Sequence, residues 1–247
     1  MINPDGASVA VVTGADRGLG LALCAGLLEQ GWRVFAGRYM PEWPELDVLA
    51  ERYPQHLCLV PLDVGSTESV QSAAAAVGQA AGRVDLLINN AGIGGGRSDL
   101  ADESGEGGLD YDAIHRAYNV NALGAIRMVE AFMPLMEDSP LKRLCFVSSE
   151  AGSISLAHRT GGFGYCMSKA ALNMAVKITF NRLRPRGYTF RLYHPGWMRS
   201  YMSGQKGTAG DMEPEESAAS AIPYFVEGRD DEDRLVLIDY LGQEWPF

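Results

Sequence analysis

Tyr165 and Lys169 lie four residues apart in the segment Y-C-M-S-K, so on a helix their side chains would share one face. A phenol with a pKa of about 10 is a poor acid–base catalyst at neutral pH, and a neighbouring ammonium lowers that pKa by favouring the phenolate. Such a pair can protonate an alkoxide or deprotonate an alcohol. An isolated pair of this kind is more often a solvated surface Tyr and Lys, so this interpretation depends on the rest of the chain.

A second group of residues has the spacing of an anion-binding loop. Residues 13–20 read T-G-A-D-R-G-L-G, directly after an apolar segment and before an amphipathic one. Gly14 permits a tight turn, Gly18 lets the backbone approach a phosphate, and Gly20 lets the helix that begins near Leu19 pack close to the strand. The helix N-terminus would then bind a pyrophosphate. The spacing is neither G-x-G-x-x-G nor that of a P-loop, and a glycine-rich turn without a ligand remains the alternative.

Further motifs follow in a definite order along the chain. N-N-A-G occupies residues 89–92, Asn121 lies in N-A-L-G, Ser149 follows a predicted strand, and Pro195-Gly196 follows the next one. Together with Y-C-M-S-K, this series resembles the short-chain dehydrogenase/reductase family over nearly the whole chain. S-S-E-A-G-S-I (148–154), Y-C-M-S-K-A-A-L-N (165–173) and the ending I-D-Y-L-G-Q-E-W-P-F resemble the branch with C-factor-like and carbonyl-reductase-like proteins.

The resemblance implies a role for each catalytic candidate. Tyr165 would be the general acid or base, and Lys169 would hydrogen-bond the nicotinamide ribose. The Ser149 hydroxyl would polarise a carbonyl oxygen, and Asn121 would hold a water that links Lys169 to solvent. Ser149 and Tyr165 are sixteen residues apart, about three more than is usual in the family. We therefore expect residues 158–164 to form a longer loop beside the pocket.

The choice of cofactor depends on two arginines. Gly37 and Arg38 follow a predicted strand, at the place where a fold specific for NAD would carry an acid for the ribose 2′-hydroxyl. Arg17 precedes Gly18 in the glycine loop and can reach the same position. A guanidinium suits a phosphate dianion, so the two arginines favour NADP(H) over NAD(H). Two solvated surface arginines are the alternative.

The remaining cofactor contacts follow from the family resemblance. Ser200 takes the place of the usual threonine that binds the carboxamide, and it keeps the hydroxyl. The adenine, the adenosine ribose and the nicotinamide are expected to be contacted, in that order, by Asp63 and Val64, by Asn90, Ala91 and Gly92, and by Pro195, Gly196 and Met198. Trp197, Met198, Tyr201 and Met202 form either an apolar substrate lid or ordinary packing, and residues 92–108 either bind substrate or form mobile surface.

Strands that alternate with helices must position these residues, and they predict a doubly wound α/β fold of the Rossmann type, in one domain over residues 1–247. We expect seven mostly parallel strands in the order 3-2-1-4-5-6-7, with helices on both faces and the ligand at the carboxyl ends of the strands. The expected strands are Val9–Thr13, Arg33–Ala36, Leu57–Pro61, Val84–Ile88, Arg143–Ser148, Thr189–Tyr193 and Leu235–Ile238. The expected helices are Leu19–Gln30, Trp43–Arg52, Thr67–Ala80, Tyr111–Met136, Tyr165–Arg182 and Glu215–Val226.

Composition excludes several classes of function. The 21 lysines and arginines against 31 aspartates and glutamates give the 247-residue chain a formal charge of −10, which argues against binding to nucleic acid or to anionic membranes. We expect no membrane span and no signal peptide, and therefore a cytoplasmic protein with reduced thiols. Neither the four cysteines nor the four histidines have the spacing of metal ligands, so no metal is expected. Family members often pair through the helices 111–136 and 165–182, which implies a homodimer or homotetramer.

The sequence thus predicts an NADPH-dependent oxidoreductase that reduces a ketone or aldehyde to an alcohol, with a small molecule as its substrate. Two alternatives remain open at this point. One is a cofactor-bound signalling or regulatory protein of the same fold. The other is an alcohol dehydrogenase, or an epimerase-like enzyme, that works in a biosynthetic pathway, because the same residues serve both reaction directions.

Overall fold

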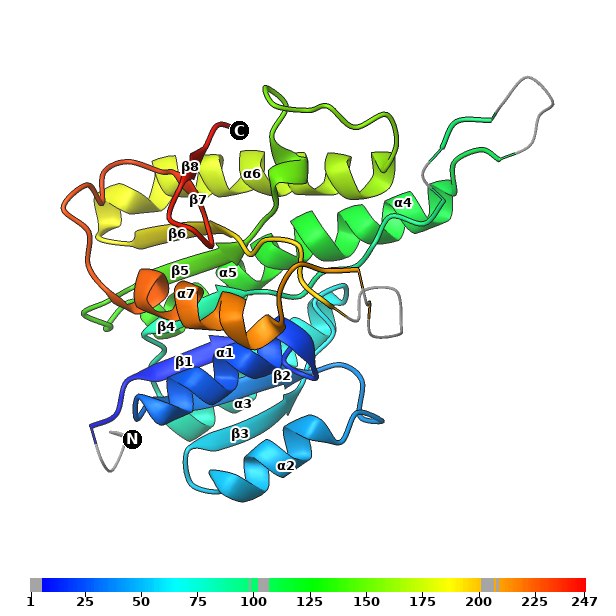
Figure 1. The fold of residues 1–247 in the computed structure, drawn as a ribbon. Coiled ribbons are helices and arrows are strands. Elements are labelled where there is room, and N and C mark those ends of the chain that lie inside the picture. The colour runs from blue at the N-terminus through cyan, green and yellow to red at the C-terminus, as the bar shows by residue number, and fades with distance from the viewer. Residues whose placement is uncertain (1–5, 98, 102–106, 201–206, 208) are drawn as a thin grey trace.

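A single sheet runs through the computed structural model, which describes residues 6–97, 99–101, 107–200, 207 and 209–247. Its strand order is β3-β2-β1-β4-β5-β6-β7-β8 (Figure 1). All neighbouring strands are parallel except β7 and β8. The strands are β1 (Val9–Val12), β2 (Arg33–Arg38), β3 (Leu57–Pro61), β4 (Leu86–Asn89), β5 (Arg143–Val147), β6 (Thr189–His194), β7 (Leu237–Asp239) and β8 (Glu244–Trp245).

The predicted order is confirmed for the first seven strands, and their bounds differ from the expected ones by no more than two residues. The predicted count of seven is wrong, because β8 adds an antiparallel edge strand beside β7. The chain reverses there through Gly242, which has a φ of 80°. A strand of two residues is too short to show the alternation of polar and apolar positions by which strands are recognised.

Helices connect the strands. They are α1 (Gly18–Glu29), α2 (Glu45–Arg52), α3 (Thr67–Ala81), α4 (Tyr111–Tyr118), α5 (Gly124–Met136), α6 (Phe163–Leu183) and α7 (Pro214–Val226), with short turns η1 (Asn119–Leu123), η2 (Glu150–Gly152) and η3 (Arg184–Arg186). The helix expected over Tyr111–Met136 is divided, because η1 is a wider π-helical turn between α4 and α5. Such turns are frequent at functional sites.

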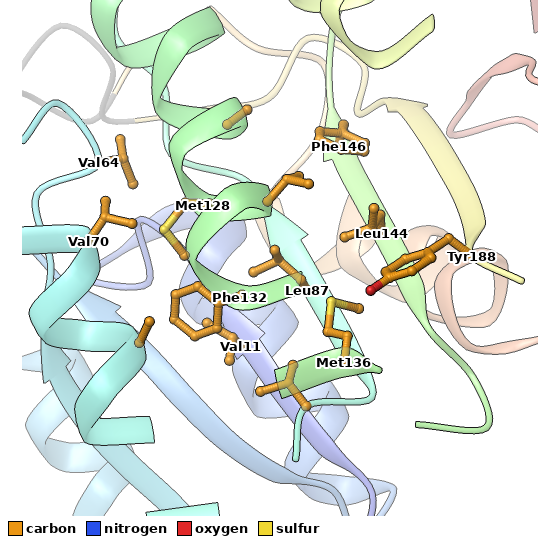
Figure 2. Packing of buried hydrophobic residues seen from close by; sticks show 14 of the residues in the cluster. Val11, Val64, Val70, Leu87, Met128, Phe132, Met136, Leu144, Phe146 and Tyr188 are labelled. Carbon is orange, nitrogen blue, oxygen red and sulfur yellow. The ribbon is translucent and has the colours of Figure 1, made fainter. Parts of the chain in front are cut away.

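Two hydrophobic layers cover the sheet. Val9 and Val11 of β1 contribute to the layer under α3, α5 and α6, whereas Ala10 and Val12 contribute to the layer under α1, α2 and α7. This alternation follows from the two-residue period of a strand. Figure 2 shows Met128 and Phe132 of α5 packed against the first of these faces. The strands are therefore buried on both sides, and their carboxyl ends are the places where the sheet can meet a ligand.

Two buried arginines attach the end of α7 to the sheet. The side chains of Arg143 in β5 and Arg191 in β6 are 2% and 1% exposed, and both bind the carboxylate of Glu232, at 3.3 and 2.6 Å. Arg143 also donates to the carbonyl oxygens of Phe225 and Glu227, at 2.8 and 2.9 Å. Carbonyl groups at the end of a helix have no partner within the helix, so the guanidinium satisfies them.

Replacing Glu232 with glutamine removes the counter-charge of both buried arginines, and we expect a loss of about 3 kcal/mol in the free energy of unfolding at pH 7. Burial would raise the pKa of Glu232, but the hydrogen bond and charge of Arg191 together with the charge of Arg143 bring it below its usual value. Its contribution is therefore present above the unfolded-state pKa and is lost as the pH falls through the lower folded-state pKa. Urea denaturation of wild type and E232Q between pH 7 and pH 3 measures both effects.

Asp231 provides the matched control, because its carboxylate binds Arg229 at the surface. Asp231→Asn should change the unfolding free energy far less than E232Q does. An equal loss in the two variants would contradict the role assigned to the buried cluster.

Candidate active site

A cleft with a volume of about 1370 Å³ crosses the carboxyl ends of the strands. Its wall includes most of the residues that the sequence analysis named: Gly14, Arg17, Gly18, Leu19, Gly20, Asp63, Val64, Asn90, Ala91, Gly92, Ser149, Tyr165, Lys169, Pro195, Gly196, Met198 and Ser200. Of the catalytic and cofactor-binding candidates, Arg38 and Asn121 lie outside this wall. The fold thus gathers into one cleft side chains that are up to 186 positions apart, from Gly14 to Ser200.

The glycine loop brings the start of α1 to one end of the cleft. Gly14 has a φ of 63°, and a Cβ atom there would lie 2.9 Å from the Cα of Ala91. A Cβ on Gly20 would lie 2.1 Å from the carbonyl oxygen of Gly14. Both positions therefore require glycine, for backbone conformation in one case and for close packing in the other. α1 begins at Gly18 without a hydrogen bond from a capping side chain, so its first N–H groups can receive a phosphate.

Asn90 holds the glycine loop against the neighbouring strand end. Its amide nitrogen donates to the carbonyl oxygens of Thr13 and Gly14, at 2.9 and 3.1 Å. In return, Thr13 Oγ1 accepts from the backbone N–H groups of Asn90 and Ala91, at 3.0 and 2.9 Å. Asn90 was expected to contact the adenosine ribose, and its side-chain amide is engaged in positioning the loop.

The two arginines of the cofactor hypothesis differ in their surroundings. Arg17 lies on the cleft wall, with its guanidinium carbon 4.3 Å from the ring centre of Trp43. Arg38 points instead towards α2, where it binds both carboxylate oxygens of Asp47 at 2.9 and 2.7 Å. The structure therefore brings Arg17 to the cleft and holds Arg38 beside it. The sequence motif around Arg38 does not predict this salt bridge, because Asp47 lies nine positions further along the chain.

Asp16 is a residue of this region that the sequence analysis missed. Its side chain is buried, and its oxygens accept from the backbone N–H groups of Tyr39 and Met40 at 3.0 Å each. Asp16 thereby fixes the chain after β2 to the glycine loop. The signal that could have found it is its place inside the loop motif, because a carboxylate buried there needs hydrogen-bond donors.

Tyr165 and Lys169 face the cleft from the first turns of α6. Burial lowers the pKa of Lys169 to about 8, and its Nζ donates to the carbonyl oxygen of Val147 at 3.0 Å. Nζ lies 5.7 Å from the centre of the Tyr165 ring. Burial raises the pKa of Tyr165 to about 12, while a hydrogen bond with Ser149 lowers it. From the spacing of the two residues we expected the ammonium to dominate the pKa of Tyr165, but desolvation of the phenolate is the larger effect.

Asn121 lies in the π-helical turn η1 and is buried behind the cleft. Its amide nitrogen donates to the carbonyl oxygen of Ile93 at 2.9 Å and to Ser168 Oγ at 2.8 Å, and its oxygen accepts from Ile93 N–H at 2.8 Å. It therefore joins η1 to α6 and to the segment after β4. The position of Gly92 lies between Asn121 and Lys169, since a Cβ there would be 3.4 and 3.6 Å from their polar atoms.

Ser149 lies two residues after the end of β5, at the start of η2, and charged groups lie close to it. Its hydroxyl donates to Glu150, and the backbone N–H of Ala151 donates to Ser149 Oγ at 3.1 Å. Glu150 also accepts from Arg159 and lies 3.8 Å from Nε2 of His194. His158 and Arg159 lie on the cleft wall, so part of the longer segment 158–164 adjoins the site. The sequence analysis did not assign roles to Glu150 or Arg159, although the first is adjacent to Ser149 and the second lies in the segment of unusual length.

The segment after β6 completes the cleft. Gly196 has a φ of 79°, and a Cβ there would lie 2.7 Å from the ring of Tyr240. The carbonyl oxygen of Pro195 accepts from Ser217 Oγ at 2.8 Å, and the backbone N–H of Ser200 donates to Met198 at 2.8 Å. Trp197 is exposed at this rim. Tyr201 and Met202, the other two members of the expected apolar lid, lie outside the described residues.

The described part of the chain offers neither a cluster of metal ligands nor a helix suited to a membrane. There, no group of three or more His, Cys, Asp or Glu side chains is arranged to hold a metal ion. Nor does any helix within these ranges combine the length and the apolar character that a membrane crossing needs.

Known proteins share both the sequence pattern and the fold. A sequence model described as short chain dehydrogenase matches residues 8–210. C-signal from Myxococcus xanthus is 36% identical over 166 residues, which cover 67% of this chain and 94% of that protein. The crystal structure of NADPH-bound carbonyl reductase from chicken fatty liver is 28% identical, with a TM-score of 0.83 over 98% of this chain and 99% of that one.

A second structure gives a similar result. A short-chain dehydrogenase/reductase from Burkholderia multivorans with bound NADP is 28% identical, with a TM-score of 0.82 over 98% of this chain and all of that one (100%). The family match covers well over half of the chain and includes the glycine loop, Ser149, Tyr165 and Lys169. This chain therefore belongs to the short-chain dehydrogenase/reductase family and is an oxidoreductase.

Proposed function

We propose that the protein reduces a ketone or an aldehyde to an alcohol with NADPH. The observation that carries this proposal is the joint position of Ser149, Tyr165 and Lys169 on the wall of the cleft that the glycine loop enters. The fit to a dinucleotide rests on the start of α1, which lacks a capping side chain, and on Arg17 at the same end. When bound, the reduced cofactor supplies a hydride to the carbonyl carbon.

The residues of this chain handle the oxygen of the substrate. Tyr165 donates its phenolic proton to the alkoxide oxygen that forms as the hydride arrives. Ser149 hydrogen-bonds the same oxygen and stabilises its developing charge. The carbonyl oxygen of Val147 holds the ammonium of Lys169 beside the phenol. Its positive charge stabilises the phenolate, so it favours loss of the proton from Tyr165.

A signalling role remains the second candidate, because C-signal is among the relatives. A binding protein has no need for a half-buried phenol beside a buried ammonium on the cleft wall, so the arrangement of Tyr165 and Lys169 favours turnover. The four cysteines are free, two of them buried, which supports the cytoplasmic location that the sequence analysis expects.

Tyr165→Phe tests the catalytic role. Removal of the phenolic hydroxyl removes the proton donor, so the rate of NADPH oxidation with a panel of ketones and aldehydes should fall by about 10²- to 10⁴-fold. The Kd for NADPH, measured by its fluorescence, should remain within about threefold of the wild-type value, because the phenolic proton acts in the reaction step and not in cofactor binding. Tyr111→Phe on the exposed face of α4 is the control and should keep full activity. A Y165F enzyme with wild-type turnover would refute the mechanism.

Arg17→Ala tests the preference for NADP(H). The loss of a charge-assisted bond to the 2′-phosphate should raise the Kd for NADPH roughly tenfold to a hundredfold and leave that for NADH nearly unchanged. Arg38→Ala should raise the Kd for NADPH less than R17A does, because the guanidinium of Arg38 must first leave the carboxylate of Asp47 before it can bind a phosphate. Titration of each variant with both cofactors provides the measurement, and equal losses of NADPH and NADH in R17A would exclude the 2′-phosphate assignment.

The proposal includes the homo-oligomer expected from the sequence. Met167, Met174 and Ile178 lie exposed along α6, and Tyr111 and Tyr118 lie exposed on α4, which packs against α6. Light scattering of the wild type should give a multiple of 26.7 kDa. Met174→Glu should reduce the mass to that of one chain, whereas Val48→Glu, at an exposed position of α2, should not change it. A monomeric wild type would contradict this part of the proposal.

A further inference from the structure

Glu150 occupies an unusual place for a carboxylate, directly after the serine that is proposed to hold the substrate oxygen. One of its oxygens accepts the proton of Ser149, and the other accepts from Arg159. The first oxygen is also 3.8 Å from Nε2 of His194. The Glu150 side chain is 21% exposed, and all four residues lie on the cleft wall.

The contact with Glu150 determines what Ser149 can do. A serine hydroxyl has one proton to donate, and both the carboxylate of Glu150 and the phenolic oxygen of Tyr165 hydrogen-bond this hydroxyl. The backbone N–H of Ala151 donates to Ser149 Oγ, so it uses one of the acceptor positions of that oxygen. A carbonyl oxygen that enters the site must therefore compete with Glu150 for the proton of Ser149.

The charge of Glu150 also acts on the reacting oxygens. A carboxylate near the place where an alkoxide or phenolate forms disfavours the new negative charge. The guanidinium of Arg159 opposes this effect from the other side of the carboxylate. Arg159 is half exposed and belongs to the segment 158–164, whose length departs from the usual family spacing.

We propose that Glu150 and Arg159 form a positioning pair for the catalytic residues, in which Glu150 directs the Ser149 hydroxyl and Arg159 limits the effect of the Glu150 charge on the proton of Tyr165. The assignment deepens the proposed reductase function and rests on it. Neither residue transfers the hydride or the proton. Their effect reaches the reaction through Ser149 and Tyr165.

The electrostatic surroundings of Tyr165 agree with this assignment. Burial is the largest cause of the raised pKa of Tyr165, and the hydrogen bond with Ser149, which lowers it, comes next. Among the smaller causes, the charge of Glu150 raises the pKa of Tyr165 and the charge of Arg159 lowers it. Burial would also raise the pKa of Glu150, but the hydrogen bonds from Ser149 and Arg159 bring it below its usual value, so Glu150 is ionised at neutral pH. The other titratable groups that face this cluster are Cys166 and Lys169 of α6, His194 of β6 and, beside His194, Asp239 of β7.

The pH titration of Tyr165 itself tests the pair without a known substrate. Tyrosine labelled with ¹³C at Cζ is followed by NMR in the NADP⁺-saturated protein, and the signal missing from Y165F identifies Tyr165. We expect E150Q to lower the pKa of Tyr165 and R159Q to raise it, each by about one pH unit. The double variant E150Q/R159Q should lie between the two single variants. Arg159→Lys, which keeps the charge, should stay close to wild type.

Opposite shifts separate this role from a structural one, because a variant that merely loosens the site would move the pKa of Tyr165 in one direction in both cases. Shifts of the same sign, or no shift in either variant, would overturn the proposal. Should E150Q fail to fold, the comparison of R159Q with R159K decides the question. Only R159Q removes the charge, so only R159Q should raise the pKa of Tyr165. The Tyr165 titration does not depend on turnover. Full activity of Y165F would therefore refute the proposed function alone, whereas an inactive Y165F with unshifted titrations would refute only the pair.

Discussion

The hydrogen bonds between Thr13 and Asn90 join the two strand ends on which the rest of the site depends. β1 and β4 are the neighbours between which the strand order reverses, from β3-β2-β1 on one side to β4-β5-β6-β7 on the other. At such a reversal the connections leave towards opposite faces, and a crevice opens at the carboxyl ends. Thr13 Oγ1 and the Asn90 amide hold the glycine loop and the N-N-A-G segment together at this point. The start of α1 therefore meets the cleft in a fixed orientation.

Local charge, and not the charge of the whole protein, decides what the cleft can bind. The chain carries a formal charge of −10, yet Arg17, Lys169 and Arg159 line the cleft. Charges interact strongly only at short range, because water and salt screen the distant ones. An acidic protein can thus hold an anionic dinucleotide where a cation such as Arg17 lies beside a helix N-terminus. The same reasoning explains why the carboxylate of Glu150 matters at the other end of the cleft.

Much of the fold could be predicted, and the failures have physical causes. The seven strands followed from apolar runs that alternate with helical patterns, and their order followed from the Rossmann type of fold that the family resemblance implies. β8 was missed because two residues carry no periodic signal, and η1 was missed because a π-helical turn has nearly the same hydrophobic spacing as an α-helix. The motif around Arg38 could not predict the direction of its side chain. That direction depends on the salt bridge to Asp47, and the turn into α2 brings Asp47 close to Arg38.

The sequence by itself determined which residue types occur where chemistry is possible: the glycines of the loop, the phenol and ammonium one helical turn apart, and the serine at a strand end. These depend on spacing within one element and on backbone conformation, which are local properties. Only the tertiary structure decided how strongly each group is desolvated and which charge lies beside it. The raised pKa of Tyr165 comes from its burial in the packed fold, and the contact of Glu150 with His194 joins segments distant in sequence. Burial and through-space electrostatics depend on the packed arrangement of all strands and helices, so no single motif contains them.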